Sequence, residues 1–270
     1  MKVAFICVNY NNSKYTLDYI SSLNKSSIHE FEIIVVDNNS SEIDLVNLLK
    51  SKLNFKLIKS KTNLGYFKGL NLGLDSIGNK DEYDYAVIGN NDLTFENNFI
   101  NELSNEKLDS SIFVIAPNII KPDGSHQNPH IVNKFNFIER LYRRLYYTNY
   151  YISVFMQFFM SLKIRLSKSY DRDGSNREQL ILMGYGACYI LTHNFLKNFK
   201  NLDAPNFLMG EEGVLANQIL SKNGKTIYKP NIIVHHHDHT SIGKISNRKL
   251  YNFSKESYEY AFKNHKFLSK

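Results

Sequence analysis

The fold prediction rests on two short apolar runs, VAFICV at residues 3–8 and FEIIVVD at residues 31–37. Both runs are continuous and rich in β-branched residues, which is typical of strands buried on both faces of a sheet. Leu17, Ile20 and Leu23 lie between the two runs at helical spacing. A helix that connects two buried strands implies a parallel sheet with right-handed crossovers.

The alternation of strand and helix continues as far as residue 116. The predicted elements are helices near 13–25, 42–52, 67–76 and 97–104 and further strands at 55–59, 84–89 and 112–116. A turn signal, Pro122-Asp123-Gly124, follows the last of these strands, and the regular alternation stops there. We therefore predict an α/β fold with a mostly parallel sheet.

The second half of the chain is less regular. Residues 137–168 are predicted to form a long aromatic and basic helix, and residues 169–178 a polar loop. The remaining predicted elements are a strand over 180–192, a helix over 211–222, a strand over 226–236 and a helix after Ser246. One α/β domain with an appended helical part is the simplest organisation for a chain of this length.

Composition limits the functional classes without selecting one. The net charge of +7 and the pI near 9.1 favour an anionic partner, which could be nucleic acid, an anionic membrane or a phosphorylated substrate. Cys7 and Cys188 lie in apolar strand-like runs, the usual setting of inert buried thiols. The N-terminal apolar run is too short for a signal peptide. We therefore expect a cytoplasmic protein.

Polar clusters follow three of the predicted strands. They are Asn9-Tyr10-Asn11, Asp37-Asn38-Asn39-Ser40 and Asn90-Asn91-Asp92. Ligands bind outside the carboxyl ends of the strands in an open α/β sheet, so these clusters are expected to converge on one binding site. Asn and Asp are also common in turns and helix caps, but three clusters at one edge favour a site.

The turn after the first predicted strand, VNYNNS, contains no glycine. Neither the dinucleotide-binding fingerprint nor the phosphate-binding P-loop is therefore present, which weakens an NAD-enzyme or ATPase interpretation. A diphosphate ligand would then need a metal ion to neutralise it. The oxygen-rich Asp and Asn side chains suit Mg²⁺ or Mn²⁺.

Further segments extend this pattern through most of the chain. In order, they are ICVNYNN, IIVVDNNS, TNLGYFKGLNLGL, VIGNNDLTF, MGYGACYILT, FLMGEEGVLANQIL and KPNIIVHHHDHTS. Together they resemble the inverting family-two glycosyltransferases of the GT-A fold, especially the branch with rhamnosyltransferases and other O-antigen-type sugar transferases. The resemblance implies a GT-A domain over 1–240, with a nucleotide-binding half at 1–116, an inserted aromatic–basic helix at 137–168, an acceptor and catalytic half at 178–240, and a C-terminal helical tail at 241–270.

The resemblance implies a nucleotide pocket in the first half. The residues at the matching positions are Asn9, Tyr10, Asn11, Asp37, Asn39, Asn63, Gly65, Asn71, Asn90 and Asn91. The carboxylate of Asp37 suits hydrogen bonds to the base or the ribose. Gly65, Gly69 and Gly73 are four residues apart and share one helix face, so we favour close packing over ligand contact for these glycines.

The resemblance also implies a metal site. Asn90-Asn91-Asp92 occupies the place of the family's Asp-x-Asp motif, so Asp92 is expected to bind Mg²⁺ or Mn²⁺ directly and Asn90 more weakly. A histidine after the last strand often completes this site, and His236 is favoured over His235. Zinc is a minor alternative, because no cysteine lies close in the sequence.

Glu211 and Glu212 match the acidic pair that supplies the catalytic base. The family pattern there is usually Glu-Asp or Asp-Asp, so the second Glu departs from it by one methylene. Glu212 is the expected base, and Glu211 is expected to orient the acceptor or the base. Carboxylates also favour helix N-termini, which is a structural alternative for the pair.

Residues 145–162 (LYYTNYYISVFMQFFMSL) contain no charge. Basic residues flank them: Arg140, Arg143 and Arg144 before, and Lys163, Arg165 and Lys168 after. Length alone would admit a membrane span, but one crossing would separate Asp92 from Glu212. The tyrosines suit a helix at the membrane surface, and a core-packing helix or a lid stays open as the alternative.

The expected partners are a TDP- or UDP-sugar donor and a lipid-linked or oligosaccharide acceptor, with peripheral contact to the inner face of an anionic membrane. The expected setting is cell-surface polysaccharide synthesis. Two other classes stay open, namely a non-catalytic protein that binds nucleic acid or anionic membranes and a sugar nucleotidyltransferase. The chain carries no recognised nucleic-acid motif, and it lacks the Gly-rich basic loop of nucleotidyltransferases.

Overall fold

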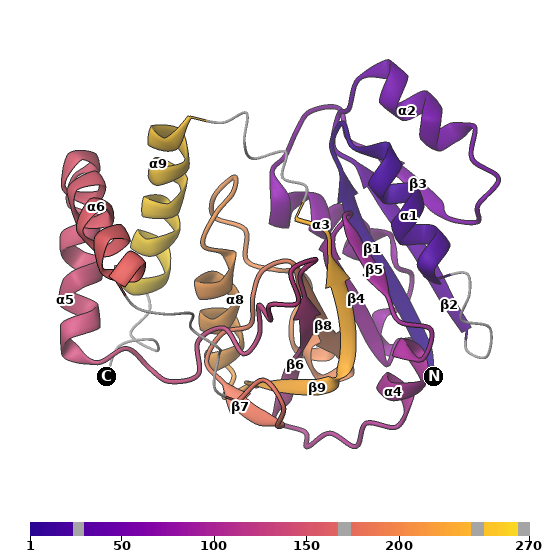
Figure 1. Ribbon diagram of the computed structural model, residues 1–270. Coiled ribbons are helices and arrows are strands. Elements are labelled where there is room, and N and C mark those ends of the chain that lie inside the picture. Colours follow the sequence, from indigo (N-terminus) through magenta and orange to yellow (C-terminus); the bar gives the residue numbers. More distant parts are fainter. Residues whose placement is uncertain (24–29, 167–173, 239–245, 264–270) are drawn as a thin grey trace.

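The computed structural model describes residues 1–23, 30–166, 174–238 and 246–263. Within these residues a nine-stranded sheet runs in the order β3-β2-β1-β4-β8-β6-β9-β5, with β7 paired to β9 beside this path (Figure 1). The strands are β1 Lys2–Asn9, β2 Glu30–Asp37, β3 Lys56–Lys59, β4 Tyr85–Asn90, β5 Leu93–Phe95, β6 Ile112–Ile120, β7 Gln179–Ile181, β8 Cys188–Thr192 and β9 Lys225–His236.

The helices of the described residues lie between the strands and after the last strand in the sequence. They are α1 Ser13–Leu23, α2 Glu42–Leu49, α3 Tyr66–Ser76, α4 Phe99–Ser104, α5 Phe137–Tyr146, α6 Tyr150–Leu166, α7 His193–Asn198, α8 Glu211–Leu220 and α9 Asn247–Tyr258, with short turns η1 Lys80–Glu82 and η3 Glu259–Lys263. In Figure 1, α5, α6 and α9 stand together on one side of the molecule, and α1 and α2 lie on the other.

Strand β1 shows why its sequence is continuously apolar. Val3, Phe5 and Cys7 belong to one core cluster with residues of α1, whereas Ala4 and Ile6 belong to a second cluster with residues of α3. Alternate side chains of a strand point to opposite faces of the sheet. Both faces of β1 are covered, so an apolar residue is favoured at every position.

The sheet is mixed, and its parallel part is the part that the strand–helix alternation predicts. The parallel pairs are β1 with β2 and β4, β2 with β3, and β6 with β9. The strand predicted over 180–192 is wrong as one element, because β7 and β8 are separate and pair with different strands. β8 lies antiparallel between β4 and β6. β5 and α7 are absent from the prediction, since elements of three and six residues are too short to show a period.

The glycines of α3 allow this helix to lie close to β1. A Cβ atom on Gly73 would be 2.2 Å from Ile6 Cγ2, and one on Gly69 would be 3.0 Å from Val8 Cγ2. Real Cβ atoms do not approach so closely, so a larger residue at position 73 would push the helix outwards. The geometry supports the packing role predicted for these two glycines.

The aromatic–basic segment forms two helices, where one helix over 137–168 is the prediction. α5 begins with a capping box in which Asn136 and Glu139 each bond the other's backbone N–H. The chain leaves helical geometry after Tyr146, and Asn149 Oδ1 accepts from Tyr151 N at 2.8 Å at the start of α6. A local side-chain cap therefore restarts the helix in a new direction. Residues 169–173, half of the loop predicted at 169–178, lie outside the described residues.

Helix α9 packs on α5 and α6 through tyrosine side chains. The rings of Tyr147 and Tyr258 stack with centroids 4.5 Å apart, and Tyr150 meets Tyr251 at 5.5 Å. The hydroxyl groups of Tyr147 and Ser254 lie 2.7 Å apart. Among the residues described by the structure, no helix combines the length and the apolar character needed to cross a bilayer.

Candidate active site

The side chain of Asn9 joins the carboxyl ends of β1 and β2. It is fully buried, and its Nδ2 donates to Asp37 Oδ1 at 3.1 Å and to Asp44 Oδ2 at 2.8 Å. Its Oδ1 accepts from Thr16 Oγ1 at 2.8 Å. Burial alone would raise the pKa of Asp44, but hydrogen bonds from Asn9 and Ser13 outweigh it and hold the pKa below its usual value. Asn9 therefore connects the carboxylates of Asp37 and Asp44, and the lowered pKa keeps Asp44 ionised.

The third cluster joins the same network. Asn91 Nδ2 donates to Thr16 Oγ1 at 2.8 Å and also lies 3.4 Å from Asn9 Oδ1. Asn11 Oδ1 accepts from Ser41 N at 2.7 Å. The three clusters converge, as the strand order predicts, but much of their hydrogen bonding is to one another.

Three of the predicted donor residues are exposed at this edge, namely Tyr10, Asn39 and Asn11, the last of which is hydrogen-bonded to Ser41 N. Tyr10 is 40% exposed. Asn39 is exposed and adopts a left-handed conformation with φ 65°. Asp37, another predicted donor residue, is only 2% exposed, and its Oδ2 accepts from Ser40 N at 3.3 Å. A ligand at this edge would first meet Tyr10 and Asn39.

Asn63, Gly65 and Asn71 hold loops in place. Asn63 Oδ1 accepts from Asn38 Nδ2 at 3.0 Å. Gly65 has φ +85°, and a Cβ atom there would lie 2.0 Å from the carbonyl oxygen of Phe207. Asn71 pairs with both backbone groups of Leu202 at 2.9 Å. These contacts bring the segment before α8 over α3.

Asp92 and His236 come together where β4 and β9 end. Asp92 is 4% exposed and His236 3% exposed, and Asp92 Oδ1 lies 3.3 Å from His236 Nε2. Asn90 Nδ2 is also 3.3 Å from His236 Nε2. His235 points elsewhere, with its Nε2 2.6 Å from Glu96 Oε1. The one-residue ambiguity in the histidine run is thus resolved in space, since neighbouring strand residues face opposite sides.

Gln127 orients the His236 ring. Gln127 Oε1 lies 2.7 Å from His236 Nδ1, and Gln127 is itself 8% exposed. An amide oxygen can only accept, so Nδ1 donates to Gln127, and this bond holds the ring with Nε2 towards Asn90 and Asp92. Gln127 is missing from the sequence-based list of site residues, because nothing in its local sequence marks it.

The acidic pair opens α8 after a strained turn. Met209 has φ 74° and Gly210 has φ 81°, so two successive residues are left-handed before Glu211. Met209 is the costly one, because a side chain disfavours this conformation. Its carbonyl oxygen accepts hydrogen bonds from Asn206 and from Ser257 of α9. Helix α9 thus helps to hold the turn that positions the pair.

Burial and mutual repulsion perturb the pair. Burial, and then the charge of Glu212, raise the pKa of Glu211 to about 8. Burial also raises the pKa of Glu212, while the backbone N–H of Gly186, 3.2 Å from Glu212 Oε1, opposes this by stabilising the ionised form. Two neighbouring carboxyls in this setting do not both ionise readily. The pair therefore binds a proton more tightly than two free carboxyls would, and Glu212 is the member that has a backbone N–H donor from Gly186.

The Gly186–Ala187 segment links the acidic pair to the Asp92 region. Gly186 N donates to Glu212, its carbonyl oxygen accepts from Tyr66 Oη at 2.8 Å, and the Ala187 carbonyl oxygen accepts from Asn90 N at 2.9 Å. A Cβ atom on Gly186 would lie 2.8 Å from Glu212 Oε1. Only glycine allows this approach.

Tyr66 is a second residue that the sequence-based list omits. Burial, followed by nearby carboxylates that include Glu211 and Asp92, raises the pKa of Tyr66 well above its usual value. Tyr66 therefore stays a neutral phenol within electrostatic reach of both halves of the site. Its place directly after Gly65 in the quoted GYF segment is the signal that could have found it.

The donor atoms near Asp92 suit a hard divalent cation. No cluster of three or more His, Cys, Asp or Glu side chains able to hold a metal is found in the described ranges. Asp92 and His236 nevertheless place a carboxylate and an imidazole nitrogen 3.3 Å apart, with Asn90 beside them. Mg²⁺ sites commonly use one or two protein ligands and take the rest from phosphates and water. The residues fit a metal shared with a diphosphate.

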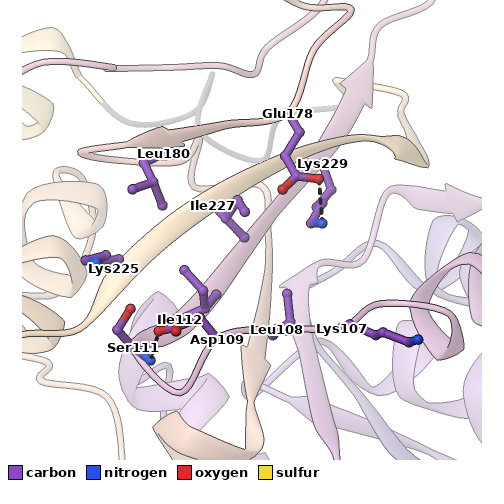
Figure 2. A pocket seen from close by; sticks show the side chains of 10 residues that line it. All are labelled: Lys107, Leu108, Asp109, Ser111, Ile112, Glu178, Leu180, Lys225, Ile227 and Lys229. Atoms are coloured by element: carbon purple, nitrogen blue, oxygen red, sulfur yellow. Dashed lines mark hydrogen bonds and ion pairs between the residues drawn. The ribbon is translucent and has the colours of Figure 1, made fainter.

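A pocket of about 310 Å³ lies away from these residues, at the opposite end of β9 (Figure 2). Lys229 in its wall is 6% exposed and pairs with Glu106 at 2.5 Å and Glu178 at 2.6 Å. Burial alone would lower the pKa of Lys229, but these two hydrogen bonds outweigh it and raise the pKa. Its charge is matched internally, so we do not take this pocket as the active site.

The perturbed acidic pair and the Asp92–His236 pair thus bring ionisable side chains and donor atoms suited to a hard cation to the carboxyl edge of an α/β sheet. The chain belongs to Glycosyl transferase family 2, whose family model matches residues 4–167. An uncharacterized glycosyltransferase of Haemophilus influenzae is 36% identical over 81 residues, which cover 29% of this chain and 25% of the relative. The poly(ribitol-phosphate) beta-N-acetylglucosaminyltransferase TarS of Staphylococcus aureus is 36% identical over 69 residues, or 24% of this chain and 12% of TarS.

Solved structures agree on the fold. TarS 1–349 of S. aureus in complex with UDP-GlcNAc superposes with a TM-score of 0.56 at 17% identity, covering 94% of this chain and 64% of that one. A mannosyltransferase of Pyrobaculum calidifontis in complex with GDP-Man and Mn²⁺ gives a TM-score of 0.53 at 12% identity, covering 88% of this chain and 57% of that one. The predicted GT-A fold is confirmed.

Proposed function

We propose that this chain is a metal-dependent, inverting glycosyltransferase that moves a sugar from a nucleoside diphosphate sugar to an acceptor hydroxyl group. The observation that carries the proposal is the Gly186–Ala187 segment, which is hydrogen-bonded to Glu212 through Gly186 and to Asn90, two residues before Asp92, through Ala187. One pair can accept a proton, and the other can share a cation with a diphosphate. Inverting transfer needs these two functions on opposite sides of one sugar.

Glu212 is the proposed base. It removes the proton from the acceptor hydroxyl as that oxygen attacks the anomeric carbon, and the bond from this carbon to the diphosphate breaks on the opposite face. Glu211 keeps its proton and so leaves the charge on Glu212. Tyr66 stays protonated and holds the Gly186 carbonyl oxygen, which fixes the N–H group that Glu212 uses.

Asp92 and His236 are the proposed protein ligands of Mg²⁺ or Mn²⁺, with Asn90 beside them. A bound cation would neutralise charge on the leaving diphosphate. The mannosyltransferase similar in fold was solved with GDP-Man and Mn²⁺, which supports a divalent metal here. Tyr10, Asn39 and Asp37 are the proposed contacts to the nucleoside.

The proposed donor is a UDP- or TDP-sugar. TarS, which is similar in fold, was solved with UDP-GlcNAc, which supports the uridine nucleotide. The O-antigen-type resemblance of the sequence instead supports TDP-rhamnose. The proposed acceptor is a lipid-linked glycan or an oligosaccharide in cell-surface polysaccharide synthesis, and the proposed location is peripheral, on the inner face of the cell membrane.

A nucleotide panel tests the proposal. Thermal unfolding is followed with UDP, TDP, GDP and CDP, each with and without Mn²⁺. We expect one diphosphate to raise the melting temperature only when Mn²⁺ is present, and the Asp92→Ala variant to lose that response. Stabilisation by DNA or RNA alone would instead identify a non-catalytic binding protein, and no response to any diphosphate would contradict the proposal.

A further inference from the structure

Helices α5 and α6 expose a large apolar surface. Its most exposed members, between 53% and 75% accessible, are Phe137, Ile138, Tyr151, Phe155, Phe158 and Phe159. We call this set the α5–α6 apolar face. Large contiguous apolar patches on a soluble fold usually mark a binding surface, because scattered single residues are normal and clusters are not.

Packing inside the chain accounts for only one side of these helices. Tyr147 and Tyr150 contact Tyr251 and Tyr258 of α9, and Ser153 is 1% exposed. The core-packing alternative from the sequence therefore explains the tyrosine side and leaves the phenylalanine side unexplained. Figure 1 shows α5 and α6 at the outer edge of the molecule, away from α1 and α2.

The charge around the face is basic in sum, although Glu139 on α5 and Glu256 on α9 are exposed acidic residues. From residue 137 to residue 166 the sequence contains one acidic residue, Glu139, against five basic residues. Arg144 on α5 and Arg248 and Lys249 at the start of α9 are exposed. An apolar surface with a basic surround matches an anionic lipid surface, where apolar side chains enter the acyl boundary and cations meet headgroups.

The same charge argues against a second copy of the chain. A twofold interface places the same patch on both partners, so the basic surround of one copy would face that of the other. Like charges brought together across an interface oppose association. An anionic bilayer has no such conflict.

We propose that the α5–α6 apolar face docks on the surface of an anionic membrane. Helix α9 connects this face to the catalytic machinery, since it packs on α5 and its Ser257 bonds the Met209 carbonyl oxygen just before the acidic pair. A chain docked in this way carries the acidic pair at a set position relative to the lipid. The proposal deepens the proposed function by naming the partner surface, and it rests on that function only for the lipid-linked acceptor.

Vesicle flotation tests the docking. The full chain is floated with vesicles of phosphatidylcholine alone and of phosphatidylcholine with 30% phosphatidylglycerol, at low and at high salt. We expect binding to the anionic vesicles that weakens with salt, and at least a tenfold loss in the triple variant Phe155→Ser, Phe158→Ser, Phe159→Ser. The matched control is Ile43→Ser, Leu49→Ser on α2, which removes two exposed apolar side chains elsewhere and should bind like the wild type.

Other readouts separate the possible outcomes. Absence of wild-type binding, or equal binding by the triple variant, would overturn the proposal. A wild-type dimer that the triple variant converts to a monomer, without vesicle binding by either, would assign the face to a second copy and also overturn it. Asp92→Ala should float like the wild type, and the triple variant should keep the diphosphate and Mn²⁺ response, so a failure of docking and a failure of the proposed reaction are distinguishable.

Discussion

The amide cluster at the ends of β1 and β2 and the acidic pair at the start of α8 differ in how completely their polar atoms are hydrogen-bonded. Asn9 bonds Asp37, Asp44 and Thr16 and is fully buried. Glu211 is 7% exposed, and its Oε1 has no hydrogen-bond partner among the residues that the structure describes. Satisfied buried groups give rigidity, whereas an unsatisfied carboxyl with a raised pKa costs stability and needs a functional explanation.

The largest expected effect is on Glu212, the proposed base. Glu212→Gln keeps the size of the side chain and removes its ability to accept a proton, so transfer should fall by about 10²–10⁴-fold. Product formation with the donor identified by the nucleotide panel measures this. Glu42→Gln, at an exposed position in the first turn of α2, is the control and should keep full turnover. Near-normal turnover of Glu212→Gln would show that Glu212 is not the catalytic base.

Asn9 should matter for stability more than for chemistry. Asn9→Leu leaves Asp37, Asp44 and Thr16 without their shared partner in a buried place, which should cost about 3 kcal/mol of unfolding free energy. Urea unfolding measures the change. Asn39→Gly, at an exposed position that already has φ 65°, should be nearly neutral. A loss below about 1 kcal/mol for Asn9→Leu would contradict its structural role.

Gln127 combines both kinds of role. It contacts only a protein side chain, but that side chain is His236, a proposed metal ligand. Gln127→Leu removes the acceptor for His236 Nδ1 and should weaken Mn²⁺ binding by about 10–100-fold, the usual cost of losing such a partner. Mn²⁺ affinity measured by titration in the presence of the nucleotide is the readout. Gln157→Leu, on the exposed side of α6, should leave the affinity unchanged. Unchanged affinity in Gln127→Leu would mean that the His236 ring needs no orientation.

The remaining expected effect is a gain in stability. The pKa of Glu211 is about 8 in the folded chain against 4.5 ordinarily, so the folded state binds the proton more tightly. Its stabilising contribution is full below pH 4.5 and is lost as the pH rises towards 8. Glu211→Gln cannot ionise, so at pH 8 its melting temperature should exceed that of the wild type. The expected difference is about 2–4 °C for each kcal/mol of unfolding free energy gained, and it should vanish near pH 4.5. A constant difference across this range would show that ionisation is not the cause.

Sequence reasoning succeeded where local spacing alone decides the outcome. The apolar runs of β1 and β2 predict buried strands, and their order predicts that Asn9, Asp37 and Asn91 meet. It was less successful for elements whose partners are distant. The three residues of β5 form a strand only because His235 and His236 of β9 lie opposite.

The site divides in the same way. The polar residue types at the strand ends were expected from the sequence, because hard cations prefer oxygen ligands, and the acidic pair was expected from the family resemblance; their roles in catalysis stay predictions. Gln127 and Tyr66 were not, since they act through contacts with residues more than a hundred positions away.

By itself, the sequence determined that an α/β sheet presents Asn and Asp side chains at one edge and an acidic pair at a helix start. Only the tertiary structure decided which of those groups form hydrogen bonds to other parts of the protein. Asn9 turns inward to two carboxylates, His236 rather than His235 meets Asp92, and one face of α5 and α6 is left exposed by the residues that the structure describes. The physical reason is that spacing along the chain sets the face on which a side chain lies, whereas its pKa and its free hydrogen bonds depend on what distant segments place opposite it.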